Sequence, residues 1–214
     1  GEVVNSYADF AKGPQRLDHF AVPQNGRTAV LSPDDHWGLL GSQTALYIQD
    51  AAKGAYRNGS LGMIGGVDTF MAQNVPAHTT GADMSGTLNQ SVVTSTVAYA
   101  DVKNTMQQTI TSSSVNLNAG DVFTIADVYA VNPVTKASTG FLKQFTVIPY
   151  SSNSLVFYPA MIWSGAFQNI YTAETDLNTK AIVAVGTAAT AYRQNMVFNK
   201  NAFALAMVPL ISPP

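Results

Sequence analysis

The sequence predicts an α+β protein in which an α/β frame, formed by both ends of the chain, surrounds an inserted all-β module. Three observations favour this class. A short apolar strand, "RTAVLSP" (27–33), leads into a helix signal. From about Gly81 the chain becomes rich in Thr, Ser, Val and Tyr, with short alternating runs separated by Gly, Asn and Pro, which is typical of a small barrel or sandwich. Beyond about residue 160 these alternating runs end. The chain shows no repeat of 20–50 residues.

The amino-terminal part of the frame is predicted element by element. In residues 1–20, Gly13 and Pro14 interrupt the apolar positions, so we expect the end of a helix followed by a loop. Ser32 is a suitable N-cap, with Pro33 at the first helical position, and residues 34–59 then favour a helix with breaks at Gly38 and Gly41. The glycine-punctuated stretch 59–81 predicts one strand, at about residues 67–73.

The inserted module and the end of the chain follow. Alternating runs predict strands within residues 90–102, 106–113, 121–131, 141–150 and 154–162. Residues 175–191 are rich in Ala and Thr and predict either helix or loop. The closing residues 193–210 predict two strands that meet around Asn199 and Asn201.

The segment "GDVFTIADVYAVNPVTKASTG" (120–140) carries the clearest barrel pattern. Asp121 is predicted to be a turn residue after Gly120. The expected core residues are listed as Phe123, Ile125, Val128 and Tyr129. Because the alternation slips after Ala126 and Asp127, we expect a bulge or a turn there.

Charge is the unusual feature of the composition. Asp, Glu, Lys and Arg make up 11% of the chain, against roughly 25% in typical proteins. Interface cores are depleted in charged residues, so this composition favours a surface that is hidden against partners. The net charge is −2 and there is no basic run, which argues against binding to DNA or RNA. The chain has no Cys, no apolar run long enough to span a membrane and no signal-peptide pattern. It begins at Gly1 without Met, and for that reason we expect a fragment.

Motifs that could carry chemistry are weak. In "SPDDH" (32–36), Asp34, Asp35 and His36 suggest a metal or general-base site, but acidic residues in the first turn of a helix also complement its dipole, and adjacent residues point in different directions. His19 and His78 lack metal-ligand spacing. "GSLGMIGG" (59–66) is not a phosphate loop, since no Lys follows it. Glu174 and Asp176 are close in sequence, and no G-x-S-x-G occurs. We therefore predict no catalytic, cofactor, metal or nucleic-acid site.

Several of these stretches together resemble a known family. "RTAVLSPDDHWGL" followed by "AYRNGSLGMIGGVDTFMAQNVPAHTTG" resembles a segment shared by the major capsid proteins of tailed phages. "LNAGDVFTIADVYAVNPVTKASTGFLKQFTVI" is similar to the insertion domain in the coat protein of the P-twenty-two type of short-tailed phage, and "NKNAFALAMVPL" to the end of that family's core. The resemblance keeps the same order from about residue 27 to residue 210.

The resemblance implies a Hong Kong 97-type capsid fold, with axial (A) and peripheral (P) domains and an inserted Greek-key barrel. Residues 1–81 and 165–214 would then be A/P core and residues 82–164 the insertion domain. The implied partners are other copies in pentamers and hexamers, together with scaffolding and portal proteins. The implied location is the shell around double-stranded DNA, reached from the host bacterial cytoplasm, with no catalytic site or cofactor. The family's amino-terminal arm, extended loop and spine helix would precede residue 1, so a truncated copy is expected, and the projecting loop at 95–106 is short.

Two other function classes stay open on the sequence. A β-rich phage or surface module that recognises carbohydrate would also have low charge, many Thr and Asn, and scattered Tyr and Trp. It would lack the α/β frame. An enzyme, for example a hydrolase using Asp34, Asp35 and His36, is the third class, and alanine replacement of those residues tests it.

Overall fold

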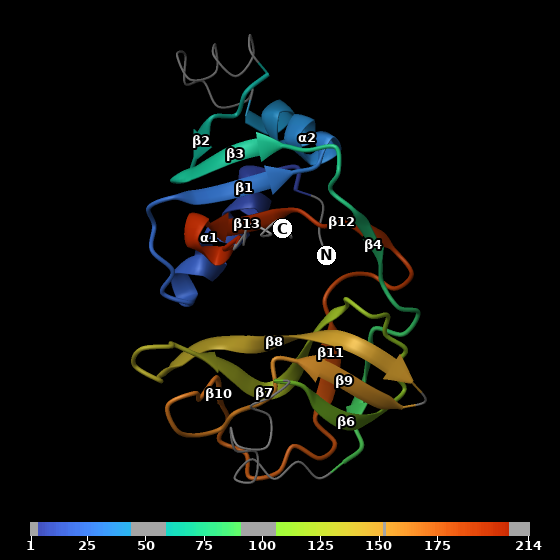
Figure 1. Ribbon diagram of the computed structural model, residues 1–214. Helices are drawn as coiled ribbons and strands as arrows, with labels where there is room; N and C mark the ends of the chain where they lie inside the picture. The colour runs from blue at the N-terminus through green and yellow to red at the C-terminus, as the bar shows by residue number, and fades with distance from the viewer. Residues whose placement is uncertain (1–3, 44–58, 91–105, 152, 206–214) are drawn as a thin grey trace, which may run out of the picture. The chain divides into compact units, whose positions relative to one another are not determined.

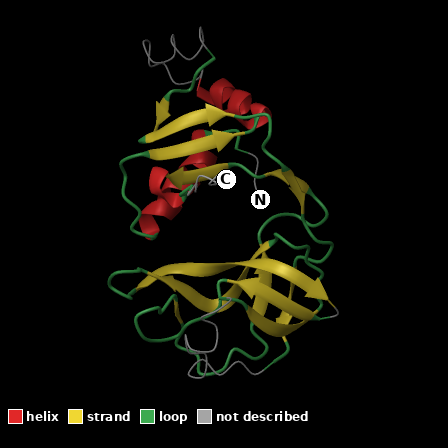
Figure 2. Ribbon diagram, viewed as in Figure 1, coloured by secondary structure: helices red, strands yellow, loops and turns green. Residues whose placement is uncertain are grey.

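The computed structural model describes residues 4–43, 59–90, 106–151 and 153–205. The chain forms two compact units. The barrel unit consists of Val75–Gln194 with the short pieces Gly1–Val4 and His19–Ala21. The frame unit draws on both ends of the chain, from Asn5–Asp18, Val22–Asn74 and Asn195–Pro214. The described part of the chain is mostly β, with few helices (Figure 2).

The frame unit is built on a four-stranded sheet in the order β13-β1-β3-β2 (Figure 1). Its strands are β1 (Arg27–Leu31), β2 (Met63–Ile64), β3 (Val67–Met71) and β13 (Met196–Asn199). β1 pairs in parallel with β3 and antiparallel with β13, which brings the two ends of the chain into one sheet. The predicted strands at 27–33 and about 67–73 are therefore confirmed, as is the first of the two closing strands.

Among the described residues, the frame unit has two α-helices. α2 (Pro33–Gln43) begins where the sequence predicts, because the Ser32 hydroxyl accepts a hydrogen bond from the Asp35 N–H at 3.2 Å. The predicted breaks at Gly38 and Gly41 are wrong, since α2 continues through both glycines. Residues 44–58 of the predicted helix lie outside the described residues. The prediction of a break in residues 1–20 is wrong, since α1 (Tyr7–His19) continues through Pro14. Pro14 has no backbone N–H, so the helix loses one of its internal hydrogen bonds there. Tertiary packing outweighs this loss, because Phe10 is buried and Gly13 lies directly against Val197 of β13.

The barrel unit contains a closed antiparallel barrel of six strands within the described residues. Its strands are β5 (Ser85–Leu88), β6 (Gln108–Ser113), β7 (Val122–Val131), β8 (Ser138–Ser151), β9 (Ser154–Tyr158) and β11 (Ala181–Ala184). The sheet runs β7-β11-β5-β6-β9-β8 and closes by pairing of β8 with β7. β6 pairs with β9 across the β7–β8–β9 meander, which is a Greek-key connection. The short β10 (Ile170–Tyr171) adds to β7.

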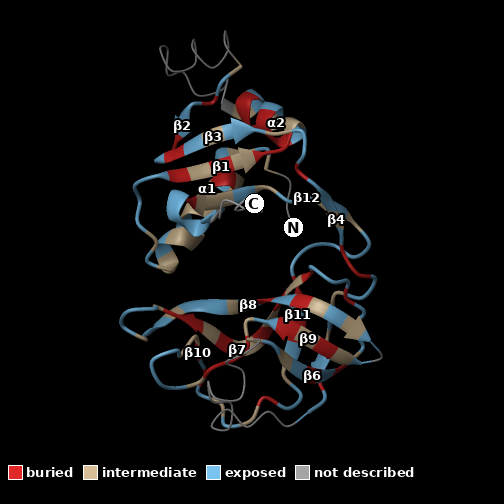
Figure 3. Ribbon diagram, viewed as in Figure 1, coloured by how far each residue is buried: buried red, intermediate tan, exposed pale blue. Residues whose placement is uncertain are grey.

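One hydrophobic core fills this barrel. Its largest side chains are Phe123, Phe145 and Phe157, each fully buried, with ring centroids 5.0–5.6 Å apart. Figure 3 shows buried segments alternating with more exposed ones along the barrel strands. Phe123, Ile125 and Val128 are buried as predicted, whereas Tyr129 is only half-buried. The alternation that predicted the barrel core is thus the pattern that builds it.

A bulge interrupts the β7–β8 pairing where the sequence predicts a slip. Asp127 has a φ of +64°, and the register shifts between Thr124 and Tyr129. The Asp127 carboxylate accepts a hydrogen bond from Lys180 Nζ at 2.6 Å, and Glu174 lies 3.1 Å from the same ammonium. One lysine therefore ties the bulge to the chain that leads into β11. The hydrogen bonds to Asp127 and Glu174 raise the pKa of Lys180 above its ordinary value.

Replacement of Lys180 by Gln is expected to give a small fall in Tm that added salt reduces, because all three groups are near solvent. Because the pKa of Lys180 is higher in the folded state, its contacts with Asp127 and Glu174 stabilise the fold fully below the ordinary pKa of 10.5. This stabilisation is lost as the pH rises through the raised pKa of the folded state. The Tm difference from wild type should thus be constant between neutral pH and about pH 10 and shrink above that. Lys136→Gln, which loses a hydrogen bond to a carbonyl rather than an ion pair, is the control. A Tm difference that grows with pH contradicts the assignment.

A two-stranded ribbon completes the barrel unit. β4 (Ala77–Thr79) pairs antiparallel with β12 (Ala191–Arg193), so the chain enters and leaves the barrel side by side. The structure divides the chain differently from the predicted ranges, because β10 and β11 lie in the barrel sheet although the sequence assigned residues after 164 to the frame. Residues 175–191, predicted as helix or loop, include β11, which fills the position between β5 and β7.

Other sequence predictions have mixed outcomes. The predicted strands at 106–113, 121–131, 141–150 and 154–162 correspond to β6–β9. Of the predicted strand at 90–102, residues 91–102 lie outside the described residues. After β13 the chain forms a 3-10 turn (Lys200–Ala202) near the predicted meeting point, and most of the second closing strand is outside the described residues. In the portion of the chain that is described, no helix combines the length and apolar character needed to cross a membrane.

Candidate functional site

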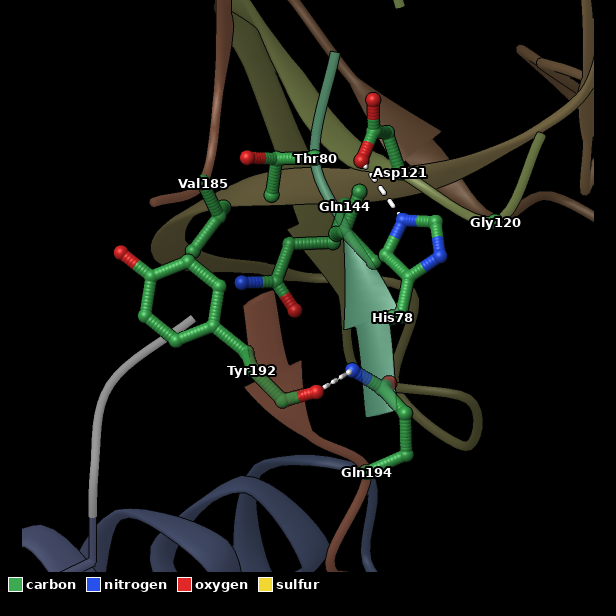
Figure 4. Close-up of a pocket in the computed structure, with 9 residues that line it drawn as sticks. His78, Thr80, Gly120, Asp121, Gln144, Val185, Tyr192 and Gln194 are labelled. Carbon is green, nitrogen blue, oxygen red and sulfur yellow. Dashed lines mark hydrogen bonds and ion pairs between the residues drawn. The ribbon is translucent and has the colours of Figure 1, made fainter. Parts of the chain in front are cut away.

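A polar site lies in the barrel unit, where the β4–β12 ribbon joins the barrel. A cavity of about 220 Å³ opens there. Its lining residues come from the ribbon, from the start of β7, from β8 and from the end of β11, and are His78, Thr80, Gly120, Asp121, Val122, Gln144, Val185, Tyr192 and Gln194 (Figure 4).

A buried carboxylate organises this site. The Asp121 side chain is 1% exposed and accepts three hydrogen bonds. His78 Nε2 donates to Oδ1 at 2.8 Å, while the backbone N–H groups of Gly81 and Asn118 donate to Oδ2 at 2.9 and 2.7 Å. Figure 4 shows the imidazole and the carboxylate turned toward each other. Three donors satisfy a buried acceptor that would otherwise be costly to desolvate.

Two glycines allow the close packing around Asp121. A Cβ at Gly81 would lie 2.1 Å from the Asn116 carbonyl oxygen, so no other residue fits without moving the backbone. Gly120 has a φ of +99°, and a Cβ there would approach the His78 ring to 3.2 Å. The backbone can therefore come near enough for the Gly81 N–H to reach the carboxylate.

The ribbon is attached to the barrel by further hydrogen bonds. The Thr80 hydroxyl donates to the carbonyl of Thr187 at 2.6 Å and accepts from the N–H of Thr190 at 3.0 Å. Asn118 Nδ2 donates to the Thr79 carbonyl at 3.0 Å. Together with the His78–Asp121 pair, these bonds fix the direction in which the ribbon leaves the barrel.

The chemistry available at this site is limited. A His–Asp pair can activate a hydroxyl nucleophile, but the Thr80 hydroxyl is engaged with backbone groups, and the Tyr192 hydroxyl accepts from the Thr187 N–H at 3.0 Å. Gln194 Nε2 donates to the Tyr192 carbonyl. Among the described residues, no group of three or more His, Cys, Asp or Glu side chains could hold a metal ion. The arrangement is suited to holding two parts of the barrel unit together.

The structure separates the residues of the "SPDDH" motif. Asp34 is exposed, whereas Asp35 is buried and accepts from Ser32 Oγ and from Asn195 Nδ2, both at 2.7 Å. His36 lies within hydrogen-bond distance of the Gly59 carbonyl at 2.9 Å. Asp35 thus links the start of α2 to the chain entering β13, and the three side chains do not converge on one point.

Alanine replacement tests this structural role of Asp35. Asp35→Ala is expected to lower the free energy of unfolding by about 2–3 kcal/mol, because it removes two hydrogen bonds to a buried charge. Asp34→Ala, one residue earlier and exposed, should cost at most about 1 kcal/mol from the helix dipole. Chemical denaturation followed by Trp37 fluorescence in a Trp163→Phe background measures both in the frame unit. Equal losses for the two variants would show that burial of Asp35 is unimportant.

The other predicted motifs are also dispersed. Glu174 contributes to the Lys180 cluster, and Asp176 accepts a hydrogen bond from the Asn178 N–H, so the two acids have separate roles. In the glycine-rich stretch, Gly59, Gly62, Gly65 and Gly66 adopt positive φ values in the turns on either side of β2. His19 is the last residue of α1 and His78 lies in β4, so the two histidines belong to different elements.

Sequence reasoning missed the pairing of His78 with Asp121. The two residues are 43 positions apart, and no local spacing connects them. The available signal was the position of each residue beside a glycine-containing turn, at Gly81 and Gly120. That signal places Asp121 in a turn, where its N–H donates to the Asn118 carbonyl, but it does not show which distant groups reach the carboxylate.

Comparison with known proteins gives one match over the whole length. A family model described as "P22 coat protein - gene protein 5" matches residues 1–214. Among solved structures, the chain is similar to one titled "CUS-3 coat protein I-domain", with 24% sequence identity and a TM-score of 0.37, over 48% of this chain and 96% of that chain. Curated proteins give no match.

Proposed function

Since the chain belongs to the P22 coat protein family, and is therefore a phage capsid protein, we propose that it is a major capsid protein whose copies form an icosahedral shell around the double-stranded DNA of a tailed phage or prophage. The family match over residues 1–214 carries this proposal, because it includes both units and not the barrel alone. Coat proteins of this family are structural proteins that assemble into the capsid of the virion.

Physical features of the chain support the proposal. A shell protein needs extensive contact surface and no active site. The charged fraction of 11% suits surfaces that become buried between copies. The side chains that line the cavity beside Asp121 make hydrogen bonds that hold the barrel unit together, and its Thr80 and Tyr192 hydroxyl groups are engaged.

The two units have proposed places in the subunit. The frame unit is assigned to the A/P core of a Hong Kong 97-type fold, since it combines a mixed sheet with two helices and is formed by both ends of the chain. The barrel unit is assigned to the insertion domain. Its proposed limits are the ribbon strands β4 and β12, in place of residues 82 and 164, because β11 completes the barrel.

The proposed partners follow from this role. They are other copies of the chain in pentamers and hexamers, a scaffolding protein and a portal protein, with assembly in the cytoplasm of the host bacterium. Net charge of −2 and the absence of a basic run support packaging without sequence-specific contacts to DNA. The alternative of a carbohydrate-binding β module is disfavoured by the frame unit, which contains two helices and the parallel β1–β3 pair.

Electron microscopy tests the proposed function. The chain, in the context of its full gene product, is co-expressed with a candidate scaffolding protein from the same phage or prophage, and the particles are purified and imaged. We expect closed shells in which pentamers and hexamers are resolved and a barrel is present in each subunit. Purification of soluble monomers alone, with no particles in the presence of the scaffolding protein, would overturn the proposal.

A further inference from the structure

One face of the frame-unit sheet carries large apolar side chains that are exposed in the described part of the structure. The strand register places Met196, Val30 and Phe70 side by side in one row. The next row contains Phe198, Thr28, Asp68 and Met63. Because cross-strand partners share a face, both rows lie on the same side of the sheet, which we call the outer face.

The two faces of this sheet differ sharply in burial. On the opposite face, Ala29, Leu31 and Val67 are fully buried, and α1 packs against Val197. On the outer face, Met63, Phe70 and Met196 are 68%, 58% and 48% exposed. A sheet with one solvated face normally alternates apolar with polar residues, so an apolar solvated face is unusual.

The chain after β13 extends the same apolar surface. Phe203, which is 65% exposed, packs edge-on against Phe198 with ring centroids 5.1 Å apart. At roughly 200 Å² for a side chain of this size, Met63, Phe70, Met196 and Phe203 leave about 500 Å² of side-chain surface exposed. That area is as large as the largest patch on a typical monomer, and with the half-buried Val30, Thr28 and Phe198 it approaches the roughly 800 Å² per partner of a specific interface.

We propose that this outer face, with Phe70 and Met196 at its centre, is a docking surface for a second copy of the same chain. The occupant follows from the area and from the proposed function, on which the inference rests: a subunit of a shell is surrounded by its own copies. The rows that form the outer face contain one charged residue. An apolar area of this size fits a partner surface with few charged residues, and a second copy of this chain, with 11% charged residues, provides such a surface.

Asp68 determines what kind of contact this is. It lies in the row between Met63 and Thr28, within the apolar surface. A two-fold contact of the outer face with itself would bring two Asp68 carboxylates into one interface, and like charges at an interface are costly. The outer face therefore docks on a different surface of the second copy, which is the head-to-tail arrangement that closes rings.

Neighbouring residues of β3 provide a matched test. Phe70→Gln and Met196→Gln change the outer face, whereas Met71→Gln changes a methionine of similar exposure, 50%, whose side chain is on the opposite side of the sheet. Self-association of each chain is measured by sedimentation velocity over a concentration series, with thermal unfolding as a check on folding. We expect the two outer-face variants to associate at least about tenfold more weakly than wild type, and Met71→Gln to associate like wild type.

A second measurement locates the contact. The chain has no Cys, so Thr28→Cys gives one thiol on the outer face and Asp34→Cys one on exposed α2. A polarity-sensitive fluorophore at position 28 should shift its emission as the chain concentration rises, and the same fluorophore at position 34 should not. An emission that is already shifted and independent of concentration would mean that the chain covers its own outer face, which overturns the proposal.

The remaining outcomes are also decisive. Equal association of Phe70→Gln, Met196→Gln and wild type, or a wild-type chain that stays monomeric at every concentration, overturns the docking surface. Neither result affects the capsid function, which particle formation by the full gene product with its scaffolding protein decides separately. Loss of shells together with normal association through the outer face would instead overturn the function.

Discussion

Replacing Asp121 by Ala is expected to lower the free energy of unfolding of the barrel unit by about 3–5 kcal/mol, because the backbone N–H groups of Gly81 and Asn118 and the His78 ring lose their acceptor together. The Gly81 N–H is buried with the carboxylate, so water does not readily replace it. Urea denaturation in a Trp37→Phe background measures this loss, since Trp163 then becomes the sole tryptophan and packs against the barrel core.

Two companion variants separate the contributions at this site. His78→Ala removes one of the three donors, from a side chain that is 23% exposed, and should cost about 1 kcal/mol. In the Asp121→Ala background, His78 has already lost the carboxylate as its partner. Adding His78→Ala to that variant should therefore change the free energy of unfolding by almost nothing. Additive losses in this double-mutant cycle, or a loss below about 1 kcal/mol for Asp121→Ala, would show that the carboxylate does not organise the ribbon junction.

The second large effect is expected at the centre of the barrel core. Phe123→Ala should destabilise the barrel unit by about 3–5 kcal/mol, because it removes a fully buried ring and leaves a cavity between Phe145 and Phe157. Part of the loss is the tilted and edge-on ring packing, with centroid distances of 5.6 and 5.5 Å. The same Trp163 fluorescence experiment measures the free energy.

Phe167→Ala is the matched control for the core variant. Phe167 is 57% exposed and lies in the loop before β10, so its replacement should change the free energy of unfolding by no more than about 0.5 kcal/mol. Phe123→Leu, which keeps most of the apolar volume, should fall between the two. If Phe123→Ala and Phe167→Ala have similar effects, the three-phenylalanine cluster is not the main support of the barrel.

Local pattern was sufficient to predict the central barrel strands. Phe123 and Ile125 alternate with Thr124 and Ala126, and the buried residues are those on one side of that alternation. The slip after Ala126 also had a local cause, since Asp127 tolerates a positive φ better than a β-branched residue does. The cap of α2 at Ser32 was predictable for the same reason, because it depends on residues three positions apart.

Features that depend on distant partners were not predictable from one sequence. α1 continues through Pro14 because Phe10 and Gly13 pack in the frame unit, partly against a strand almost two hundred residues later. Ile182 and Val183 favour a strand, but they form only a short run inside the Ala- and Thr-rich stretch 175–191, so the sequence did not show that Ile182 would be fully buried between β5 and β7. The acceptor role of Asp121 likewise depends on groups brought together only by the barrel.

The ribbon has a consequence for how such a chain can change in evolution. Thr79 of β4 and Ala191 of β12 are paired residues, so the points where the chain departs and returns are only about 5 Å apart. Everything between them could be cut out and the gap bridged by a two-residue reverse turn, which would convert the ribbon into an ordinary hairpin. The barrel is thus a removable cassette, and a lineage could gain, lose or exchange it in a single recombination event without redesigning the sheet that carries it.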